Sequence, residues 1–337
     1  MSWWLAVLAA SAPSWPAPQQ ASRSHLVRES SLPEVVHETA LMGTDLRIVI
    51  LSEDEAAARE AIAVAEAEMR RIEALMTDWD SQSQLESINR QAGIEPVRVA
   101  DELLALLEES IELSELTGGK FDVTYAGAGR LWDFRASPPA LPDPEQVRAG
   151  AARVGYERLV VDREAGTAFL KEAGMRIGLG AIAKGYAVDR AVRLIEARGF
   201  EDFAVNAGGD LAARGRKSDS ELWWVALQHP RKRGENLAIL PMSNVSAVTS
   251  GDYERFFELD GRRYCHIIDP DTGWPANGCQ SVTVLAPRTY WADALATGVF
   301  VMGPTEGLKL LESLAGIEGA IVDSSGELHL TSGLAGR

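Results

Sequence analysis

Cysteine is nearly absent from this sequence, with Cys265 and Cys279 as the only two residues of that type. Two cysteines do not make a disulfide framework, and their separation does not match the spacing of a cysteine metal site. They can pair in an oxidising compartment or serve as small core residues, and we favour the core. Because the chain has 337 residues, of which 46% are hydrophobic, it can bury a core without such crosslinks.

Basic residues are also in short supply. The 33 lysines and arginines face 49 aspartates and glutamates, which gives a formal net charge of -16. A chain with this balance lacks the basic surface that a nucleic-acid backbone requires, so we exclude nucleic acid as the partner. An acidic protein that binds a phosphorylated ligand needs a metal ion, a helix N-terminus or a few placed cations to offset the repulsion. A divalent cation would serve that purpose here.

Long apolar runs and several well-known catalytic motifs are missing as well. Apart from a short N-terminal run, no stretch approaches the roughly 20 apolar residues that span a bilayer, so we do not expect a membrane-spanning protein. G-x-S-x-G, H-E-x-x-H and kinase-type H-R-D patterns do not occur. Their absence disfavours the serine-hydrolase, zinc-protease and protein-kinase mechanisms.

Residues 1–34 differ in composition from the rest of the chain. An apolar run from Trp3 to Ala10 precedes Ala10-Ser11-Ala12, which fits an A-x-A cleavage pattern, and residues 13–34 have the composition of a linker. The run lacks the basic residues that begin a signal peptide, so a disordered or mis-started N-terminus is the alternative. We expect export to the periplasmic or cell-envelope side, or otherwise a cytoplasmic location. Residues 35–337 are expected to form one catalytic domain of two lobes.

The body of the chain alternates predicted strands and helices. Apolar residues at helical spacing predict a long helix over 52–76 with Ser52 as its cap, and a second one over 101–119 that ends at a glycine pair. A strand is predicted over 39–51, and residues 120–144 resemble a site more than a core. Because short turns join several of the later strands, we predict an α+β fold with mixed or antiparallel sheets and flanking helices.

A glycine-rich stretch, GLGAIAKGYAVDRA, occupies residues 178–191. Its third glycine has the wrong spacing for a Rossmann fingerprint, and Lys184 is followed by glycine where a Walker loop has Ser or Thr. Glycines nevertheless allow a backbone to approach a ligand closely, and a lysine near a helix start can contact a phosphate. The alternative is a tight turn into a helix with a solvated lysine.

Two further stretches carry side chains suited to chemistry. His266 lies in an apolar stretch that leads into the acidic turn D-P-D-T-G, and Asp293 and Thr297 lie four residues apart in an apolar helix. Positions i and i+4 share one helix face, so this carboxylate and hydroxyl can act as hard oxygen ligands for Mg²⁺. The alternatives are a core histidine, an acid that favours the helix dipole and a threonine bonded to an upstream carbonyl.

Taken in chain order, these stretches resemble the ApbE family of FAD:protein FMN transferases. The resemblance covers about residues 35–325. The matching segments are MGT (42–44), Ser83 to Asn89, TGGKFDVT (117–124) with LWDF (131–134), GAIAKGYAVDRA (180–191), NAGGD (206–210), TSGDYERFF (249–257), HIIDPDTG (266–273) and ADALATGVFVMG (292–303).

The resemblance implies a two-lobed α+β fold with a cleft for FAD. It also implies Mg²⁺ held by Asp293, Thr297 and the backbone carbonyl of Ala181. The family reaction moves FMN from FAD to a threonine or serine hydroxyl of a partner flavoprotein subunit and releases AMP. Because the nucleophile comes from the partner, the enzyme needs no activated serine or cysteine of its own.

Roles for individual residues follow from the resemblance together with their chemistry. His266 is the candidate proton acceptor or phosphate partner. The expected flavin or adenine contacts are Met42, Trp79 and Tyr253. The residues expected to line the nucleotide are Gly118, Asp122, Lys184, Asp210, Ser250, Gly251 and Arg255.

Two positions depart from the family pattern, which commonly has an acidic residue where this chain has Gly178 and often has one in place of Gln84. The first departure leaves the number of metal ions open. Two alternatives to FMN transfer also stay open. One is Mg²⁺-dependent hydrolysis of FAD to FMN and AMP, and the other is FAD binding without chemistry.

Overall fold

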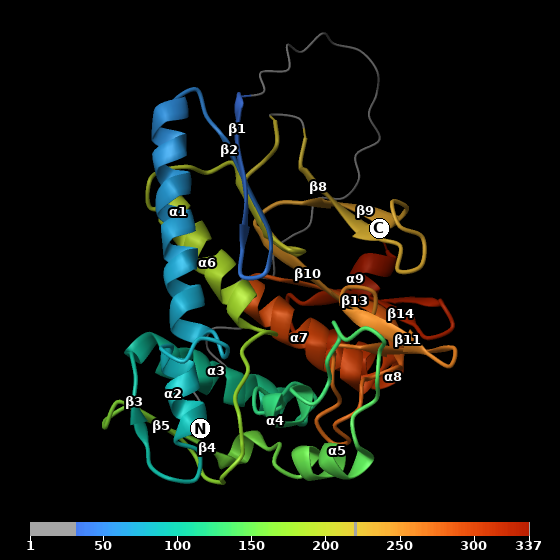
Figure 1. Ribbon diagram of the computed structural model, residues 1–337. Coiled ribbons are helices and arrows are strands. Elements are labelled where there is room, and N and C mark those ends of the chain that lie inside the picture. The colour runs from blue at the N-terminus through green and yellow to red at the C-terminus, as the bar shows by residue number, and fades with distance from the viewer. Residues whose placement is uncertain (1–31, 219–220, 337) are drawn as a thin grey trace.

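The computed structural model describes residues 32–218 and 221–336. The proposed cleavage site and most of the proposed linker therefore lie outside the described residues. An eight-stranded sheet, antiparallel throughout, organises the chain in the order β1-β2-β6-β7-β10-β13-β14-β15 (Figure 1). Its strands are β1 (Glu34–Leu41), β2 (Thr44–Leu51), β6 (Phe203–Ala207), β7 (Asp210–Arg214), β10 (Val245–Gly251), β13 (Cys279–Ala286), β14 (Glu318–Asp323) and β15 (Leu328–Leu330).

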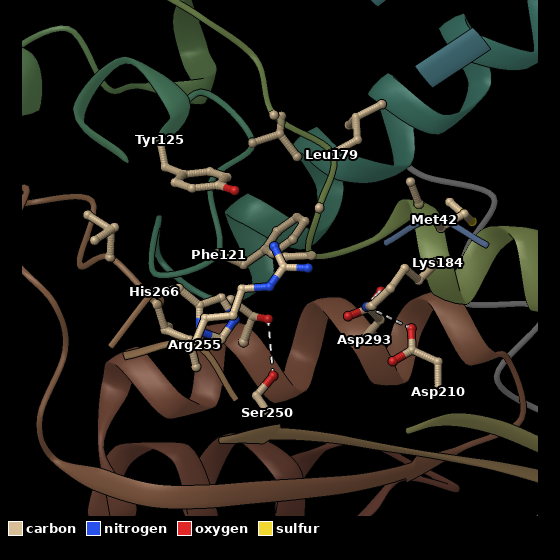
Figure 2. A pocket seen from close by; sticks show the side chains of 18 of the residues that line it. Met42, Phe121, Tyr125, Leu179, Lys184, Asp210, Ser250, Arg255, His266 and Asp293 are labelled. Carbon is tan, nitrogen blue, oxygen red and sulfur yellow. Dashed lines mark hydrogen bonds and ion pairs between the residues drawn. The ribbon is translucent and has the colours of Figure 1, made fainter. Parts of the chain in front are cut away.

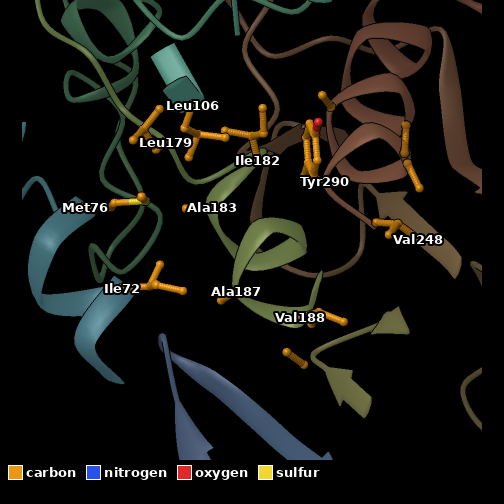
Figure 3. Close-up of a cluster of buried hydrophobic side chains, with 14 of the residues drawn as sticks. Ile72, Met76, Leu106, Leu179, Ile182, Ala183, Ala187, Val188, Val248 and Tyr290 are labelled. Atoms are coloured by element: carbon orange, nitrogen blue, oxygen red, sulfur yellow. The ribbon is translucent and has the colours of Figure 1, made fainter. Parts of the chain in front are cut away.

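Helices cover one face of this sheet. They are α1 (Glu55–Met76), α6 (Ala183–Glu196) and α7 (Thr289–Met302), with α8 (Pro304–Ser313) beside α7 and β14. Successive side chains of a strand point to opposite faces, so Ile48 and Ile50 of β2 join the core under these helices. Figure 3 shows part of this core, which includes Met76 of α1, Ala187 of α6 and Ile182 directly before α6.

The opposite face of the sheet packs against a hairpin. Val49 and Leu51 of β2 belong to a second core with β8 (Trp223–Gln228), β9 (Asn236–Met242) and the short α9 (Ser332–Ala335). Because both faces are covered at the centre of the sheet, every residue of β13 is buried. The free thiols of Cys265 and Cys279 are buried, which confirms their prediction as core residues.

A mainly helical region completes the described chain. It contains α2 (Gln84–Arg90), α3 (Asp101–Leu116), α4 (Ala126–Gly129), α5 (Pro144–Ala151), the 3₁₀ turn Tyr156–Arg158 and a small sheet of β3 (Val97–Arg98), β4 (Leu159–Asp162) and β5 (Thr167–Leu170). The hairpin β11 (Phe256–Leu259) and β12 (Arg262–Cys265) packs onto Trp132 in an aromatic cluster. The α+β prediction is confirmed. Among the described residues, no helix is long and apolar enough to cross a membrane.

Several local predictions are wrong. The expected strand over 39–51 is the β1–β2 hairpin, whose two-residue turn places Met42 at φ 54° and Gly43 at φ 70°. The cap of α1 is Asp54, which accepts a hydrogen bond from the backbone N–H of Ala57 (3.0 Å). The expectation that residues 120–144 resemble a site holds for residues 120–123 and Tyr125, which line the cavity described below, but not for Trp132, which is buried in the aromatic cluster.

The start of α7 is held by a residue from another helix. Asp189 of α6 is buried, and its carboxylate accepts hydrogen bonds from the backbone N–H (2.9 Å) and hydroxyl (2.7 Å) of Thr289 and from the N–H of Tyr290 (3.2 Å). The first turn of α7 has no cap from its own N-cap residue. Asp189 therefore satisfies donors that would otherwise be buried without partners, and it joins α6 to α7.

We expect Asp189→Ala to lower the free energy of unfolding by about 3 kcal/mol, because it leaves buried donors unpaired. The matched control is Asp54→Ala at the exposed start of α1, for which a loss of about 1 kcal/mol is expected. Urea unfolding followed by circular dichroism measures both. Equal losses for the two variants would contradict the role assigned to Asp189.

Candidate active site

One cavity collects most of the residues singled out from the sequence. Its volume of about 370 Å³ is within the range of small-molecule sites. Its walls come from the β1–β2 turn, the loop after α1, the segment before α6, the ends of β7 and β10, the chain around β11 and β12, and α7 (Figure 2). The predicted residues in its lining are Met42, Trp79, Asp122, Ala181, Lys184, Asp210, Ser250, Gly251, Arg255, His266, Asp293 and Thr297.

Three charged side chains meet at the side of the cavity formed by α6, β7 and α7. The Lys184 ammonium lies 3.1 Å from Oδ2 of Asp210 and 3.4 Å from Oδ2 of Asp293. Both aspartates are buried, with 2% and 3% of their surface exposed. Burial opposes the charge of Lys184, yet the two carboxylates raise its pKa above its usual range. Burial, and then the nearby Asp293, raise the pKa of Asp210. One cation thus faces two buried carboxylates.

The crossing of α6 and α7 fixes this group. A Cβ at position 185 would lie 2.6 Å from Cα of Tyr290 and 2.7 Å from the carbonyl oxygen of Thr289, so only glycine allows the two backbones to approach this closely. The Gly185 N–H donates a hydrogen bond to Oδ2 of Asp293 (3.2 Å). The carboxylate of one helix therefore meets the first turn of the other, where the helix dipole favours a negative charge.

Thr297 lies one turn after Asp293 on the same helix, as predicted. Its Oγ1 is 3.3 Å from the hydroxyl oxygen of Ser250 at the end of β10, and both hydroxyls line the cavity. The helix thus presents a carboxylate and a hydroxyl to the same cavity, and Ala181 is also part of the lining. This set of hard oxygen donors suits Mg²⁺.

His266 follows β12 and is held through its backbone, because its N–H donates to the carbonyl oxygen of Arg255 (3.0 Å). Within the described part of the chain, its Nδ1 is buried and has no hydrogen-bond partner. Burial, and then the positive charges of Arg255 and Lys184, lower the pKa of His266 to about 4. The imidazole is therefore neutral at neutral pH and has a free ring nitrogen.

Asn89 of α2 holds the segment that leads to Lys184. Its amide oxygen accepts a hydrogen bond from the N–H of Ile177 (2.7 Å), and its amide nitrogen donates to the Ile177 carbonyl oxygen (3.1 Å). On the other edge of the segment, the N–H of Gly178 donates to the carbonyl oxygen of Val123 (2.8 Å). The residues before α6 form a short extended segment that is supported on both sides by these bonds.

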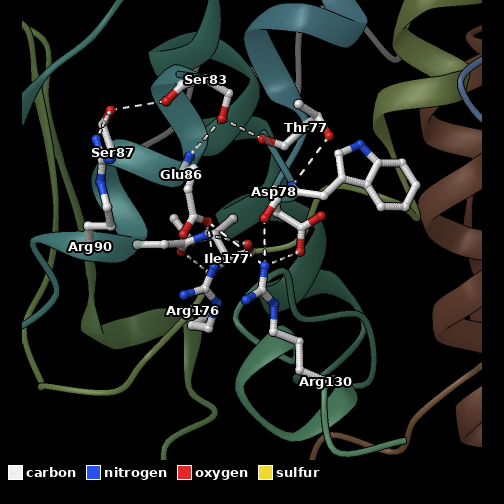
Figure 4. Close-up of polar contacts among 11 residues, drawn as sticks. Thr77, Asp78, Ser83, Glu86, Ser87, Arg90, Arg130, Arg176 and Ile177 are labelled. Atoms are coloured by element: carbon white, nitrogen blue, oxygen red, sulfur yellow. Dashed lines mark hydrogen bonds and ion pairs between the residues drawn. The ribbon is translucent and has the colours of Figure 1, made fainter. Parts of the chain in front are cut away.

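A neighbouring polar network holds the loop at the mouth of the cavity (Figure 4). The Arg130 guanidinium donates to the carbonyl oxygen of Asp78 (2.6 Å), and Glu86 pairs with Arg176. Trp79 follows Asp78, and its side chain lines the cavity although 67% of the residue is exposed. Its indole is thus held at the mouth by a fixed backbone.

Two predicted contacts lie outside the lining. Gly118 closes the C-terminal turn of α3, where its N–H donates to the Glu115 carbonyl oxygen (3.1 Å). The ring of Tyr253 packs behind Gly251, since a Cβ at position 251 would lie 2.5 Å from it. Neither residue is brought to the cavity by the structure.

Asp122 lines the cavity, but its carboxylate is already engaged. It accepts hydrogen bonds from the N–H and hydroxyl of Thr124 (both 2.7 Å) and from the N–H of Tyr156 (2.9 Å).

Gln84 lies outside the lining of the cavity. Its side-chain oxygen accepts a hydrogen bond from the N–H of Ala100 (2.7 Å). The unusual residue at position 84 therefore does not face the cavity.

The prediction missed several residues of the lining. They include Thr44, Asp78, Lys120, Phe121, Tyr125 and Leu179. Most of them lie inside or next to the segments that resemble the ApbE family, and this position in the sequence is the signal that could have identified them. Nothing in their residue types distinguished them from core or surface residues.

Comparison with known sequences identifies the family to which this chain belongs. The profile described as "ApbE family" matches residues 42–321. This chain belongs to the ApbE family. The FAD:protein FMN transferase of Treponema pallidum is 34% identical over 329 residues, which cover 92% of this chain and 89% of that protein. The FAD:protein FMN transferase of Vibrio cholerae is 35% identical over 242 residues, which cover 71% and 72% of the two chains.

Solved ApbE structures have the same fold. The crystal structure of the ApbE protein from Thermotoga maritima superimposes with a TM-score of 0.83 at 31% identity and covers 90% of this chain and 98% of that one. The flavin transferase ApbE from Vibrio cholerae gives a TM-score of 0.81 at 29% identity and covers 90% and 99%. The family resemblance seen in the sequence is confirmed.

Proposed function

We propose that this ApbE-family chain is an FAD:protein FMN transferase that uses Mg²⁺. The single observation that carries the proposal is the buried group of Lys184, Asp210 and Asp293 beside Thr297, in the cavity of a chain whose relatives are named FAD:protein FMN transferases. The reaction transfers the FMN part of FAD to a hydroxyl of an acceptor protein, and AMP leaves.

The charged side chains of the site are suited to binding a cation. When both are ionised, the two buried carboxylates exceed the charge of the one ammonium, and a buried negative charge without a partner is costly. The carboxylate of Asp293, the hydroxyl of Thr297 and the carbonyl oxygen of Ala181 would hold Mg²⁺. When bound, the ion supplies a positive charge that stabilises the negative charge developing on the phosphate oxygens.

The remaining residues orient the nucleotide and move a proton. Arg255 lines the cavity, and its guanidinium has no carboxylate partner among the described residues, so it is free to bind a phosphate oxygen. The oxygen of the acceptor hydroxyl bonds to the phosphorus of the FMN part, and the bond from that phosphorus to the bridging oxygen breaks. AMP departs with the bridging oxygen, and neutral His266 accepts the proton of the hydroxyl.

The acceptor is proposed to be a threonine or serine of a partner flavoprotein subunit. An acceptor from outside fits the described residues of the lining, because the Ser250 and Thr297 hydroxyls contact each other and neither is paired with a histidine. Such an arrangement would activate a hydroxyl of the enzyme itself. The open mouth beside Trp79 is the side on which an acceptor segment would approach.

The test is to incubate the purified protein with FAD, Mg²⁺ and an acceptor domain that carries the target threonine, and to measure the intact mass of the acceptor. We expect a mass increase equal to one FMN phosphoester and an equal amount of AMP. AMP release without a mass increase would indicate FAD hydrolysis instead. FAD binding without AMP would indicate a binding protein. Either result overturns the transferase proposal, and an acceptor with the threonine changed to alanine is the control.

A further inference from the structure

Tyr125 is a residue of the cavity to which the proposed mechanism assigns no role. It lies just before α4, and Figure 2 shows its ring extending into the cavity with the hydroxyl leading. Within the described ranges 32–218 and 221–336, its hydroxyl makes no hydrogen bond. Burial, and then the negative charge of Asp78, raise the pKa of Tyr125 to about 12. The hydroxyl therefore keeps its proton and is a free donor inside the cavity.

The Tyr125 hydroxyl lies near two glycines, which have no side chain. A Cβ at Gly178 would be 3.5 Å from the Tyr125 hydroxyl and 3.0 Å from Cβ of Ala126, and a Cβ at Gly180 would be 3.6 Å from the same hydroxyl. The space beside Gly178 is thus bounded by Tyr125 and Ala126, and the space beside Gly180 by the Tyr125 hydroxyl. A larger side chain at position 178 would displace the ring. The segment continues directly to Ala181 and Lys184, where the nucleotide phosphates are proposed to bind.

A second free donor faces the same space. Figure 2 shows the guanidinium of Arg255 reaching into the cavity from the chain before β11, while Tyr125 reaches in from the opposite wall. The other lysines and arginines of the lining are engaged, because Lys120 pairs with Asp269 and Asp271 and Lys184 pairs with two aspartates. An unpaired guanidinium and an unpartnered hydroxyl form a set of donors suited to a phosphate group.

We propose that the Tyr125 hydroxyl donates a hydrogen bond to a phosphate oxygen of the bound flavin nucleotide, and that this contact helps the site to prefer phosphorylated flavins over riboflavin. The inference rests on the proposed function, since it assumes that the cavity binds FAD. Tyr125 is a substrate-binding residue in this assignment, and it takes no part in the proton transfer.

The test compares Tyr125→Phe with Tyr253→Phe, a matched control that is also partly buried but lies outside the lining. Equilibrium binding of FAD, FMN and riboflavin is measured by flavin fluorescence in the presence of Mg²⁺. We expect Tyr125→Phe to bind FAD and FMN about tenfold more weakly, because a hydrogen bond to a charged group is lost, and to bind riboflavin as the wild type does. Tyr253→Phe should match the wild type with all three ligands.

The outcomes separate this inference from the proposed function. Unchanged FAD affinity in Tyr125→Phe overturns the contact, and an equal loss for riboflavin overturns the assignment to phosphate in favour of the flavin ring. In both cases the wild type still transfers FMN. If the wild type binds neither FAD nor FMN, the proposed function itself fails. Thermal unfolding of both variants shows whether any loss of binding reflects a loss of folding.

Discussion

Asp293→Asn will lower the rate of FMN transfer about a thousandfold. The substitution keeps the size of the side chain and an oxygen that can accept the hydrogen bond from Gly185, but it removes the negative charge that we propose holds the cation. A bound metal ion contributes several kcal/mol to the stabilisation of a phosphoryl-transfer transition state, and about 4 kcal/mol corresponds to three powers of ten in rate. The initial rate of the acceptor mass increase at saturating FAD measures the effect.

Two control measurements on this variant are its unfolding temperature and its binding of FAD. Asp293→Asn should unfold at a temperature close to that of the wild type and should still bind FAD, because Arg255 and the cavity walls are unchanged. A rate within tenfold of the wild type, in a folded variant, would contradict the assignment of Asp293 as a metal ligand. Thr297→Val, which removes the second proposed ligand on the same helix face, should also lower the rate.

Lys184→Met will lower the free energy of unfolding of the metal-free protein by about 3–5 kcal/mol. The change removes the one ammonium between Asp210 and Asp293, so two buried carboxylates are left without a compensating charge. Mg²⁺ should restore part of this loss, because the ion supplies positive charge at the same place and binds only the folded state. Urea unfolding with and without Mg²⁺ measures both effects.

Lys120→Met is the matched control for Lys184→Met. The Lys120 ammonium also faces two aspartates, at 3.4 Å from Asp269 and 2.7 Å from Asp271, but the side chain of Asp271 is 68% exposed. Solvent screens this group, so the expected loss is below about 1 kcal/mol. If the two variants lose equal stability, or if Mg²⁺ does not stabilise Lys184→Met, the buried group is not the cation site that we propose.

Sequence patterns predicted the features that depend on local spacing. Asp293 and Thr297 lie four residues apart on one helix, so their shared face follows from the helical repeat alone. The end of α3 next to a glycine pair follows from a capping preference, which involves a few neighbouring residues. The meeting of Lys184 with the two aspartates did not follow from spacing, and only the family resemblance indicated it.

Features that depend on contacts between distant segments were not predictable. Tyr253 belongs to a segment that matches the family, yet its ring packs behind Gly251 and away from the cavity. The strand β9 has no clean alternation of polar and apolar residues and contains Pro241, which its place in a two-stranded hairpin tolerates. The role of Asp189 as the cap of α7 depends on the packing of two helices, which no local pattern encodes.

The close crossing at Gly185 has a consequence for when the site is assembled. Because the backbone of α6 touches that of α7 at this point, the two helices cannot separate without unpacking the core around them. The side chains that would hold the ion are therefore brought together during folding, before any nucleotide arrives. Substrate binding does not have to organise them, so more of the binding free energy remains for discrimination between one nucleotide and another.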